Sequence, residues 1–274
     1  MKHMRIGTTS YIIPDDILPN VRYLADKVDD IELVLFESEE MSNLPDEKTI
    51  RELARLGESH GLSYTVHFPL DIYPGSADLD ERMRFMRTVE RIISLTEPLD
   101  PFGYVLHLTP ESYGPVPSED IGRWTTCLDM SLEMMVSKYE AMRRMFCIET
   151  LGYPFSHVYP LVERYDLSVT LDIGHIWLMG YPMQDNLDLL LPRTRIAHLH
   201  GVHDGKDHLG LNKGDPTQIN KFISALSNQT NKDNRERVLT LEVFSEAELD
   251  ASLSLLEKSH DMMGKDWGGR YGNH

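Results

Sequence analysis

Cysteine is scarce in this chain of 274 residues, which contains two. Cys127 and Cys147 form no Cys-x-x-Cys motif and are too few to make a disulfide framework. The first residues, MKHMRIGTTSY, lack the apolar core of a signal peptide. We therefore expect a protein of the reducing cytoplasm.

Basic residues are also few, with 27 Lys and Arg against 44 Asp and Glu, so the formal net charge is −17. Proteins that bind duplex DNA or anionic membranes gain much of their affinity from Lys and Arg. This balance argues against a nucleic acid or a membrane as the main partner. It favours a small-molecule substrate, and clustered carboxylates leave room for metal cations.

Two further features are missing from the sequence. It contains no run of 18 apolar residues, so we expect no transmembrane helix. It also has no Gly-x-Gly-x-x-Gly after the first apolar segment, where GTTSY stands instead. This second absence argues against a doubly wound dinucleotide-binding sheet.

Strand-like and helix-like segments alternate along the whole chain, a rhythm typical of an α/β protein with a (β/α)8 barrel. We expect one barrel domain over residues 1–274, with residues 1–3 a tag remnant and 264–274 a loosely ordered tail. The helices after the sixth and seventh strands are poorly defined. The patterns predict strands at 4–11, 30–36, 62–66, 104–106, 146–148, 169–171, 195–202 and 238–241, and helices from 14, at 46–60, 79–96, 119–142 and 246–260.

Six successive predicted strands end in a residue that can bind a metal. The C-terminal ends of barrel strands face one common mouth, so these side chains should meet there. Any one of these residues is more easily explained as an ordinary polar group. Six in succession are much harder to explain by chance. The residues are His67, His107, Glu149, Asp172, His198 or His200, and Glu242, with His175 and His208 in the loops beyond.

Imidazole and carboxylate ligands suit zinc best and manganese next, and eight ligands are too many for one ion. We therefore expect two or three divalent ions, with Glu149 as the bridging ligand. His198 and His200 share a face of their strand, and we favour His200, nearer the mouth, as the ligand. The expected metal ligands are His67, His107, Glu149, Asp172, His175, His200, His208 and Glu242. The expected catalytic residues are Glu149, Asp172, His175 and Glu242.

Polar residues near the expected mouth are candidates for contacting the substrate. The first two strands contribute candidates at their ends, and HLHGVHDGKDHLGL supplies the densest polar stretch. Its glycines let the loop bend closely around a ligand. The candidates are Thr9, Tyr11, Glu37, His198, His203, Lys206 and Asp207.

These motifs resemble the xylose isomerase-like barrel superfamily, specifically its endonuclease IV-type branch (AP endonuclease family 2). The matching motifs are TVHFP, VLHLTP, CIET, Asp172-x-x-His175 and Glu242. The resemblance implies three metals, usually zinc, that cleave a phosphodiester. The chain departs from the branch where Asp207 and His208 are adjacent, whereas the branch has Asp-x-His; this puts the shell of a third metal in doubt.

A sugar or sugar-phosphate isomerase or epimerase is the alternative to the metal-dependent phosphodiesterase that we expect. Sugar epimerases and isomerases of the superfamily use one metal at the positions of Glu149, Asp172, His200 and Glu242, with the two glutamates as an acid–base pair. They generally lack His67 and His107, which favours a hydrolase here. The segments IGTTSYIIPDDILPNVRYLA, DDIELVLFE and HLHGVHDGKDH resemble the CbiR family of cobamide-remodelling phosphodiesterases, which implies hydrolysis of a cobamide nucleotide loop. A non-catalytic carrier of metal or corrinoid is the remaining alternative.

Overall fold

The computed structural model describes residues 4–38 and 41–263, and the side chains up to residue 258. The predictions for residues 1–3 and for the tail at 264–274 lie outside the described residues. Within the described ranges, no helix is both long and apolar enough to cross a membrane.

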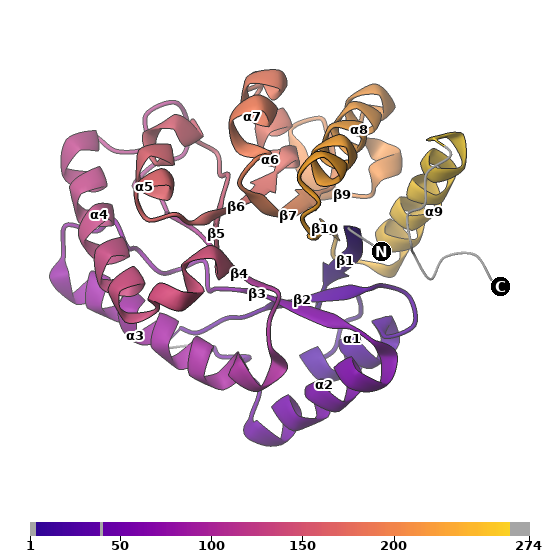
Figure 1. Ribbon diagram of the computed structural model, residues 1–274, viewed down its shortest axis with the longest axis horizontal. Coiled ribbons are helices and arrows are strands. Elements are labelled where there is room, and N and C mark those ends of the chain that lie inside the picture. Colours follow the sequence, from indigo (N-terminus) through magenta and orange to yellow (C-terminus); the bar gives the residue numbers. More distant parts are fainter. Residues whose placement is uncertain (1–3, 39–40, 264–274) are drawn as a thin grey trace.

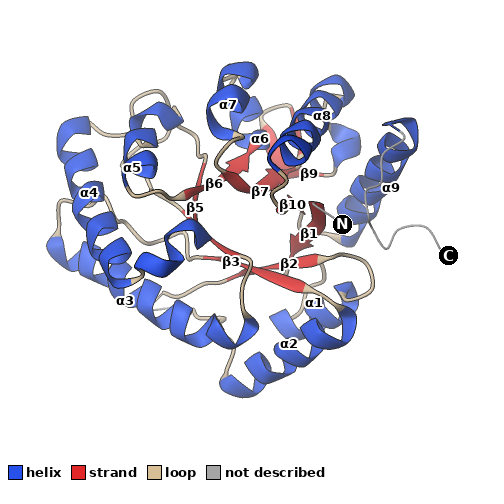
Figure 2. Ribbon diagram, viewed as in Figure 1, coloured by secondary structure: helices blue, strands red, loops and turns tan. Residues whose placement is uncertain are grey.

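Eight parallel strands close into a barrel, which confirms the predicted (β/α)8 fold. Going round the barrel, the order is β1-β10-β7-β6-β5-β4-β3-β2. Figure 2 shows these strands at the centre with the helices outside them. The barrel strands are β1 (Met4–Thr9), β2 (Asp30–Val34), β3 (Ser63–His67), β4 (Gly103–Leu106), β5 (Phe146–Glu149), β6 (Ser168–Asp172), β7 (Thr194–Leu199) and β10 (Arg237–Leu241).

The helices form an outer ring, and α9 closes it beside the first strand (Figure 1). They are α1 (Ile17–Leu24), α2 (Glu47–His60), α3 (Leu79–Thr96), α4 (Ile121–Lys138), α5 (Tyr159–Arg164), α6 (Ile173–Leu178), α7 (Met183–Leu190), α8 (Pro216–Asp233) and α9 (Glu246–Met263). Short 3₁₀ turns lie at Glu97–Leu99, Glu140–Met145, Phe155–His157 and Leu211–Lys213.

Helix α2 illustrates how the local sequence sets these elements. Its apolar residues Ile50 and Leu53 recur at helical spacing and are buried against the barrel. The Asp46 carboxylate caps the first turn by accepting a hydrogen bond from Thr49 N at 2.7 Å. Gly61 ends the helix with a left-handed φ of 60°. Both ends agree with the sequence prediction.

The segment predicted as one strand at 195–202 is two elements in the structure. Strand β7 ends at Leu199, and a two-stranded antiparallel hairpin follows, made of β8 (Gly201–His203) and β9 (Lys206–Leu209). Its turn uses Asp204 and Gly205, both with positive φ (49° and 71°), as in the type I′ turns of two-residue hairpins. The hairpin places His208 over the end of the barrel.

The helix predicted at 119–142 also breaks into two elements. Helix α4 ends at Lys138 because Tyr139 leaves helical geometry, with φ −120° and ψ 41°. The 3₁₀ turn at Glu140–Met145 then leads into β5. This difference lies away from the C-terminal ends of the strands.

Candidate metal centre

The C-terminal ends of the barrel strands bring ten histidines and carboxylates together in overlapping groups. Parallel register sets this arrangement, since Asp172 pairs with His198 across β6 and β7. Each group offers atoms that all lie within 4.8 Å of one another, as a metal ion requires. The groups are His67–His107–Glu149, Glu149–Asp172–His198–Glu242, Asp172–His175–His200–His208 and Glu32–His67–Glu242.

The first group joins two histidines to one oxygen of Glu149. Nε2 of His107 lies 2.7 Å and Nε2 of His67 lies 3.3 Å from Glu149 Oε2. The other ring nitrogen of His67, Nδ1, lies 2.7 Å from the carbonyl oxygen of Phe68. Donation of Nδ1–H to that carbonyl fixes the tautomer and leaves the Nε2 lone pair directed at the cluster.

The second group lies deeper and shares Glu149 with the first. Nδ1 of His198 lies 3.4 Å from Glu149 Oε1 and 3.1 Å from Glu242 Oε2. Although both are buried, His198 Nδ1 and Glu242 Oε2 have no hydrogen-bond partner among the described residues. Buried polar atoms without partners are costly, and a cation between them would satisfy both.

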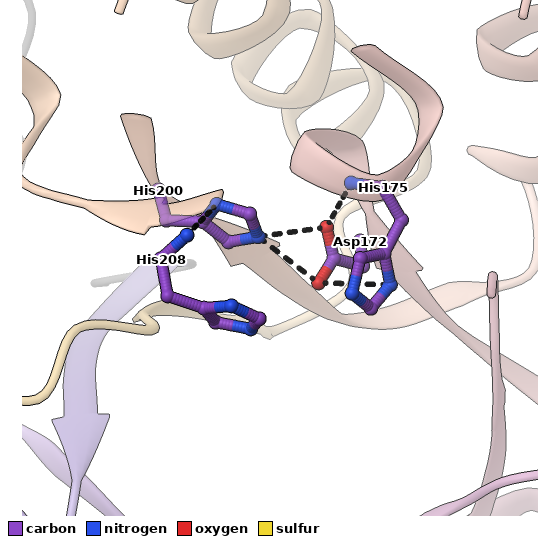
Figure 3. Close-up of side chains that lie close together, drawn as sticks. All are labelled: Asp172, His175, His200 and His208. Carbon is purple, nitrogen blue, oxygen red and sulfur yellow. Dashed lines mark hydrogen bonds and ion pairs between the residues drawn. The ribbon is translucent and has the colours of Figure 1, made fainter. Parts of the chain in front are cut away.

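The third group is drawn in Figure 3 and surrounds Asp172. Asp172 is the N-cap of α6, and its Oδ1 accepts a hydrogen bond from His175 N at 2.8 Å. The ring of His175 places Nδ1 2.9 Å from Thr150 O, which leaves Nε2 facing Asp207 Oδ2 at 4.0 Å. His208 lies opposite, with Nε2 3.5 Å from Glu242 Oε2.

Mutual electrostatics shift the pKa values of these groups in opposite directions. Burial disfavours the charged ring of His67, but Glu149 outweighs it and raises the pKa to about 9. Burial acts likewise on His208, where Glu242 raises the pKa to about 9. Burial also favours the neutral acid of Glu149, but His107 and His198 hold its pKa well below the usual range. The cluster therefore stabilises positive charge among buried carboxylates.

The residues present fit a divalent metal centre. Glu149, Asp172 and Glu242 are almost fully buried, so their negative charges require nearby cations. Mixed nitrogen and oxygen donors are the ligands of zinc and manganese, whereas calcium and magnesium prefer oxygen alone. Glu149 belongs to two of the groups, as the sequence analysis expected of a bridging ligand.

Strand β7 differs from the sequence prediction. We expected only the histidine nearer the mouth, His200, to reach the cluster beside Glu149 and Glu242. The structure places His198 there instead, and groups His200 with Asp172 and His208. The reason is that β7 ends at Leu199, so His198 is the last inward-facing residue of the strand and His200 already lies beyond it.

Glu32 is a site residue that the sequence analysis did not single out. It lies on β2, fully buried, with Oε2 2.9 Å from His198 Nε2. The sequence did contain a signal for it: Asp30, Glu32 and Val34 alternate along a strand and must share one face.

The candidates for substrate contact take several different places in the structure. Tyr11 and Asp207 line the cavity above the cluster. Glu37 instead pairs with Arg91 and Ser42 on the outside of the barrel. Thr9 is buried and donates its hydroxyl to Val243 O at 2.9 Å. The remaining three candidates are His198, which lies in the cluster, and His203 and Lys206, which lie on the exposed hairpin.

A cavity of about 1110 Å³ opens above the cluster. Its floor includes His67, His107 and Glu149. Its walls are mainly apolar, and the described residues that line it include no Lys or Arg. The apolar lining comes from the loops after several strands and includes Tyr11, Ile12, Phe36, Leu70, Tyr113, Leu178, Met179 and Phe244.

Similar solved structures agree with this architecture. A D-tagatose 3-epimerase-like protein is 19% identical, with 95% of this chain and 98% of that chain covered and a TM-score of 0.76. The 3-keto-D-glucoside 4-epimerase YcjR from E. coli is 17% identical, with 94% and 99% covered and a TM-score of 0.71. SacUVDE is 12% identical, with 93% and 99% covered and a TM-score of 0.66. At these identities the likeness establishes the fold.

Comparison with curated proteins found no significant match. A sequence profile of the family described as xylose isomerase-like TIM barrel matches residues 24–263. That range includes nine of the ten barrel and hairpin strands and each residue of the four candidate metal groups. The chain belongs to the xylose isomerase-like TIM barrel family (AP endonuclease 2).

Proposed function

We propose that the protein is a metal-dependent phosphodiesterase that holds two or three divalent ions, with zinc favoured. The observation that carries this proposal is the group His67–His107–Glu149 beside the group Glu149–Asp172–His198–Glu242. A single-metal site uses the second group and leaves the two histidines of the first without a purpose. Two adjacent groups that share a carboxylate suit a centre of more than one metal.

In this proposal, His67, His107, Glu149, Asp172, His198 and Glu242 hold two ions, and His175 and His208 serve a third. When bound, such ions lower the pKa of a water and stabilise the charge that develops at phosphorus. The protein's part is to fix the donors. The Nδ1 atoms of His67 and His175 lie against backbone carbonyls, so their Nε2 atoms keep one orientation toward the cluster.

We propose a small substrate that contains a nucleotide, most specifically a cobamide cleaved at its nucleotide loop. The resemblance of three segments to cobamide-remodelling enzymes suggests this substrate. The cavity supports it, because about 1110 Å³ with apolar walls suits a bulky, largely apolar group above the phosphodiester. A nucleic acid would require Lys and Arg along its backbone, and those described residues that line the cavity include neither.

The second candidate is a sugar or sugar-phosphate epimerase, favoured by the activities named for the similar structures. It would hold one metal at Glu149, Asp172, His198 and Glu242, with the two glutamates moving a proton. His198 takes the place of His200 as the histidine ligand, because His198 is the one grouped with Glu149 and Glu242. Against it, His107 Nε2 lies 2.7 Å from Glu149 Oε2, so the carboxylate that should act as a base is already engaged.

Metal counting on the purified protein separates the two candidates. If the protein is the proposed phosphodiesterase, the wild type should hold two or three ions per chain. His67→Ala should lose at least one ion and should also lose activity. His60→Ala is the matched control, since His60 pairs with Asp26 on the outer surface. One ion per chain, unchanged in His67→Ala, would overturn the proposal and favour the epimerase.

Product analysis then tests the substrate. Metal-loaded protein incubated with cobamides of several lower ligands should release a nucleoside of the lower-ligand base, and the reaction should stop in Glu149→Gln. Ketose epimerisation without nucleoside release would support the second candidate. Tight corrinoid binding without any turnover would indicate a carrier and contradict both enzymes.

A further inference from the structure

His200 stands in a group of four candidate ligands, yet its hydrogen bonds differ from those of the other histidines. Its Nδ1 accepts the backbone N–H of His208, with 2.9 Å between the nitrogens. A ring nitrogen that accepts a hydrogen bond carries no proton, so the proton of the imidazole is on Nε2. The Gly201 carbonyl oxygen lies farther from Nδ1, at 3.4 Å, so the nearer backbone amide, which can only donate, sets this tautomer.

The second nitrogen of His200 is also engaged. Nε2 lies 3.3 Å from Oδ1 and 3.4 Å from Oδ2 of Asp172 (Figure 3). Because Nε2 carries the proton, it donates to that carboxylate. Both ring nitrogens therefore have protein partners, and neither lone pair is left for a metal. A metal at Nε2 would require that proton to leave, and a proton on Nδ1 instead would break the hydrogen bond from the His208 amide.

His67 and His175 show the opposite arrangement. In each, Nδ1 lies beside a backbone carbonyl, at 2.7 Å in His67 and 2.9 Å in His175, and must donate to it. Their Nε2 atoms have no backbone partner and face the cluster, where a metal can take the place of a proton. The overlapping groups thus contain histidines whose Nε2 is available to a metal and one, His200, whose Nε2 is not.

The partners of His200 belong to two separate parts of the site. Asp172 ends β6 and belongs to two of the candidate metal groups. His208 belongs to the hairpin, has a left-handed φ of 53°, and stacks its ring on that of His200 at 4.4 Å and 18°. A non-glycine residue in this conformation is strained by about 1 kcal/mol or more, so it needs local support. The hydrogen bond from the His208 amide to His200 Nδ1 supplies that support.

We propose that His200 is a positioning residue, not a metal ligand. It orients the Asp172 carboxylate through Nε2–H and holds the hairpin through Nδ1, so that the His208 ring faces Glu242. Gly174 completes the arrangement, because a Cβ at that position would lie 2.0 Å from His200 Cε1. The proposal rests on the metal centre of the proposed function but not on its substrate or reaction.

The test compares His200→Gln and His200→Leu with His198→Gln. A glutamine amide offers one acceptor and one donor, as the neutral imidazole does, but it is a poor zinc ligand. Each variant is stripped of metal and reloaded with zinc, and zinc per chain, affinity and the number of imidazole ligands by X-ray absorption are measured. We expect His200→Gln to match the wild type in all three. His200→Leu should keep the imidazole count but bind zinc about tenfold to a hundredfold more weakly.

His198→Gln should lose zinc and an imidazole ligand, because His198 is a proposed ligand. Loss of an ion or of an imidazole ligand in His200→Gln would overturn the proposal. Hydrogen exchange of the His208 amide tests the hairpin contact without any metal: it should be slow in the wild type and in His200→Gln, and fast in His200→Leu. A wild type that binds no zinc would refute the proposed function, whereas equal exchange in all three proteins would refute the role of His200.

Discussion

Glu32 Oε2 lies 2.9 Å from His198 Nε2 inside the barrel, and neither side chain is exposed to solvent. A carboxylate can only accept, so Nε2 of His198 carries a proton and donates it. Nδ1 of His198 is then directed at Glu149 and Glu242, at 3.4 Å and 3.1 Å. The arrangement is that of a metal-binding histidine oriented by a buried carboxylate.

Replacing Glu32 should therefore weaken metal binding without removing a direct ligand of the proposed pair of ions. We expect Glu32→Ala to reduce zinc affinity about tenfold to a hundredfold, and Glu32→Gln to reduce it less, because the amide oxygen can still accept from His198. Competition with a chromophoric chelator measures the affinity. Asp30→Asn is the control, since Asp30 lies on the same strand but bonds to Ser63 and Thr65. Equal affinity in Glu32→Ala and wild type would contradict this role.

The sequence predicted the barrel and the strand ends at His67, Glu149, Asp172 and Glu242 because apolar runs stop where chains leave a buried sheet. Alternation along β2 puts Glu32 on one face with Asp30 and Val34, but the sequence could not pair it with His198, which is 166 positions away. The pairing depends on barrel closure, which local patterns do not contain.

The hairpin is a different case, because its signal was present. Asp204-Gly205 between alternating residues is a strong two-residue turn motif. A strand predicted through His200 places that residue beside Glu149, whereas the turn ends the strand at Leu199 and leaves His198 in that place. The ring nitrogens that His175 and His200 leave free are set by backbone atoms of other segments, Thr150 O and the His208 amide, and cannot be predicted from sequence.

Gly174→Ala should disturb the centre through His200. The added Cβ would lie 2.0 Å from His200 Cε1, so the ring must move and lose its contact with Asp172. We expect a loss of about 1–3 kcal/mol in the free energy of unfolding, measured by urea denaturation, together with weaker zinc binding. Gly122→Ala is the control, because the nearest atom to its Cβ is 3.6 Å away and α4 should gain helix propensity. Wild-type stability in Gly174→Ala would show that the ring is not confined.

Asp166 should give stability a distinct acid dependence. Arg144 donates to it at 2.8 Å and 3.1 Å and Arg193 at 3.1 Å, and these contacts, those of Arg144 first, lower its pKa to about 2. In the unfolded chain the pKa is about 3.9. The ion pairs therefore stabilise the fold fully above about pH 4, and their contribution disappears as the pH falls through about 2.

Asp166→Asn tests this dependence, because asparagine tolerates the left-handed φ of 51° at this position. The variant should be less stable than wild type at pH 7, and the difference in urea midpoint should shrink between pH 4 and pH 2. Asp46→Asn, at the exposed cap of α2, gives the comparison for an acid that bonds to the backbone. A difference for Asp166→Asn that stays constant over this pH range would rule out the ion pairs as its cause.

The apolar mouth should determine substrate binding more than turnover. Leu70 and Tyr113 line the cavity while remaining 50% and 64% exposed, as expected of groups that cover a large ligand. Leu70→Ala and Tyr113→Ala should each raise KM several-fold, about 1 kcal/mol of lost contact, with little change in kcat, because the contact is the same in the ground and transition states. Steady-state kinetics with a cobamide measures both constants.

Leu79→Ala is the control: this side chain is 56% exposed, lies at the start of α3 and is absent from the described lining of the cavity. A fall in kcat at constant KM would mean that the mouth acts on the reacting centre and not on the bulk of the substrate.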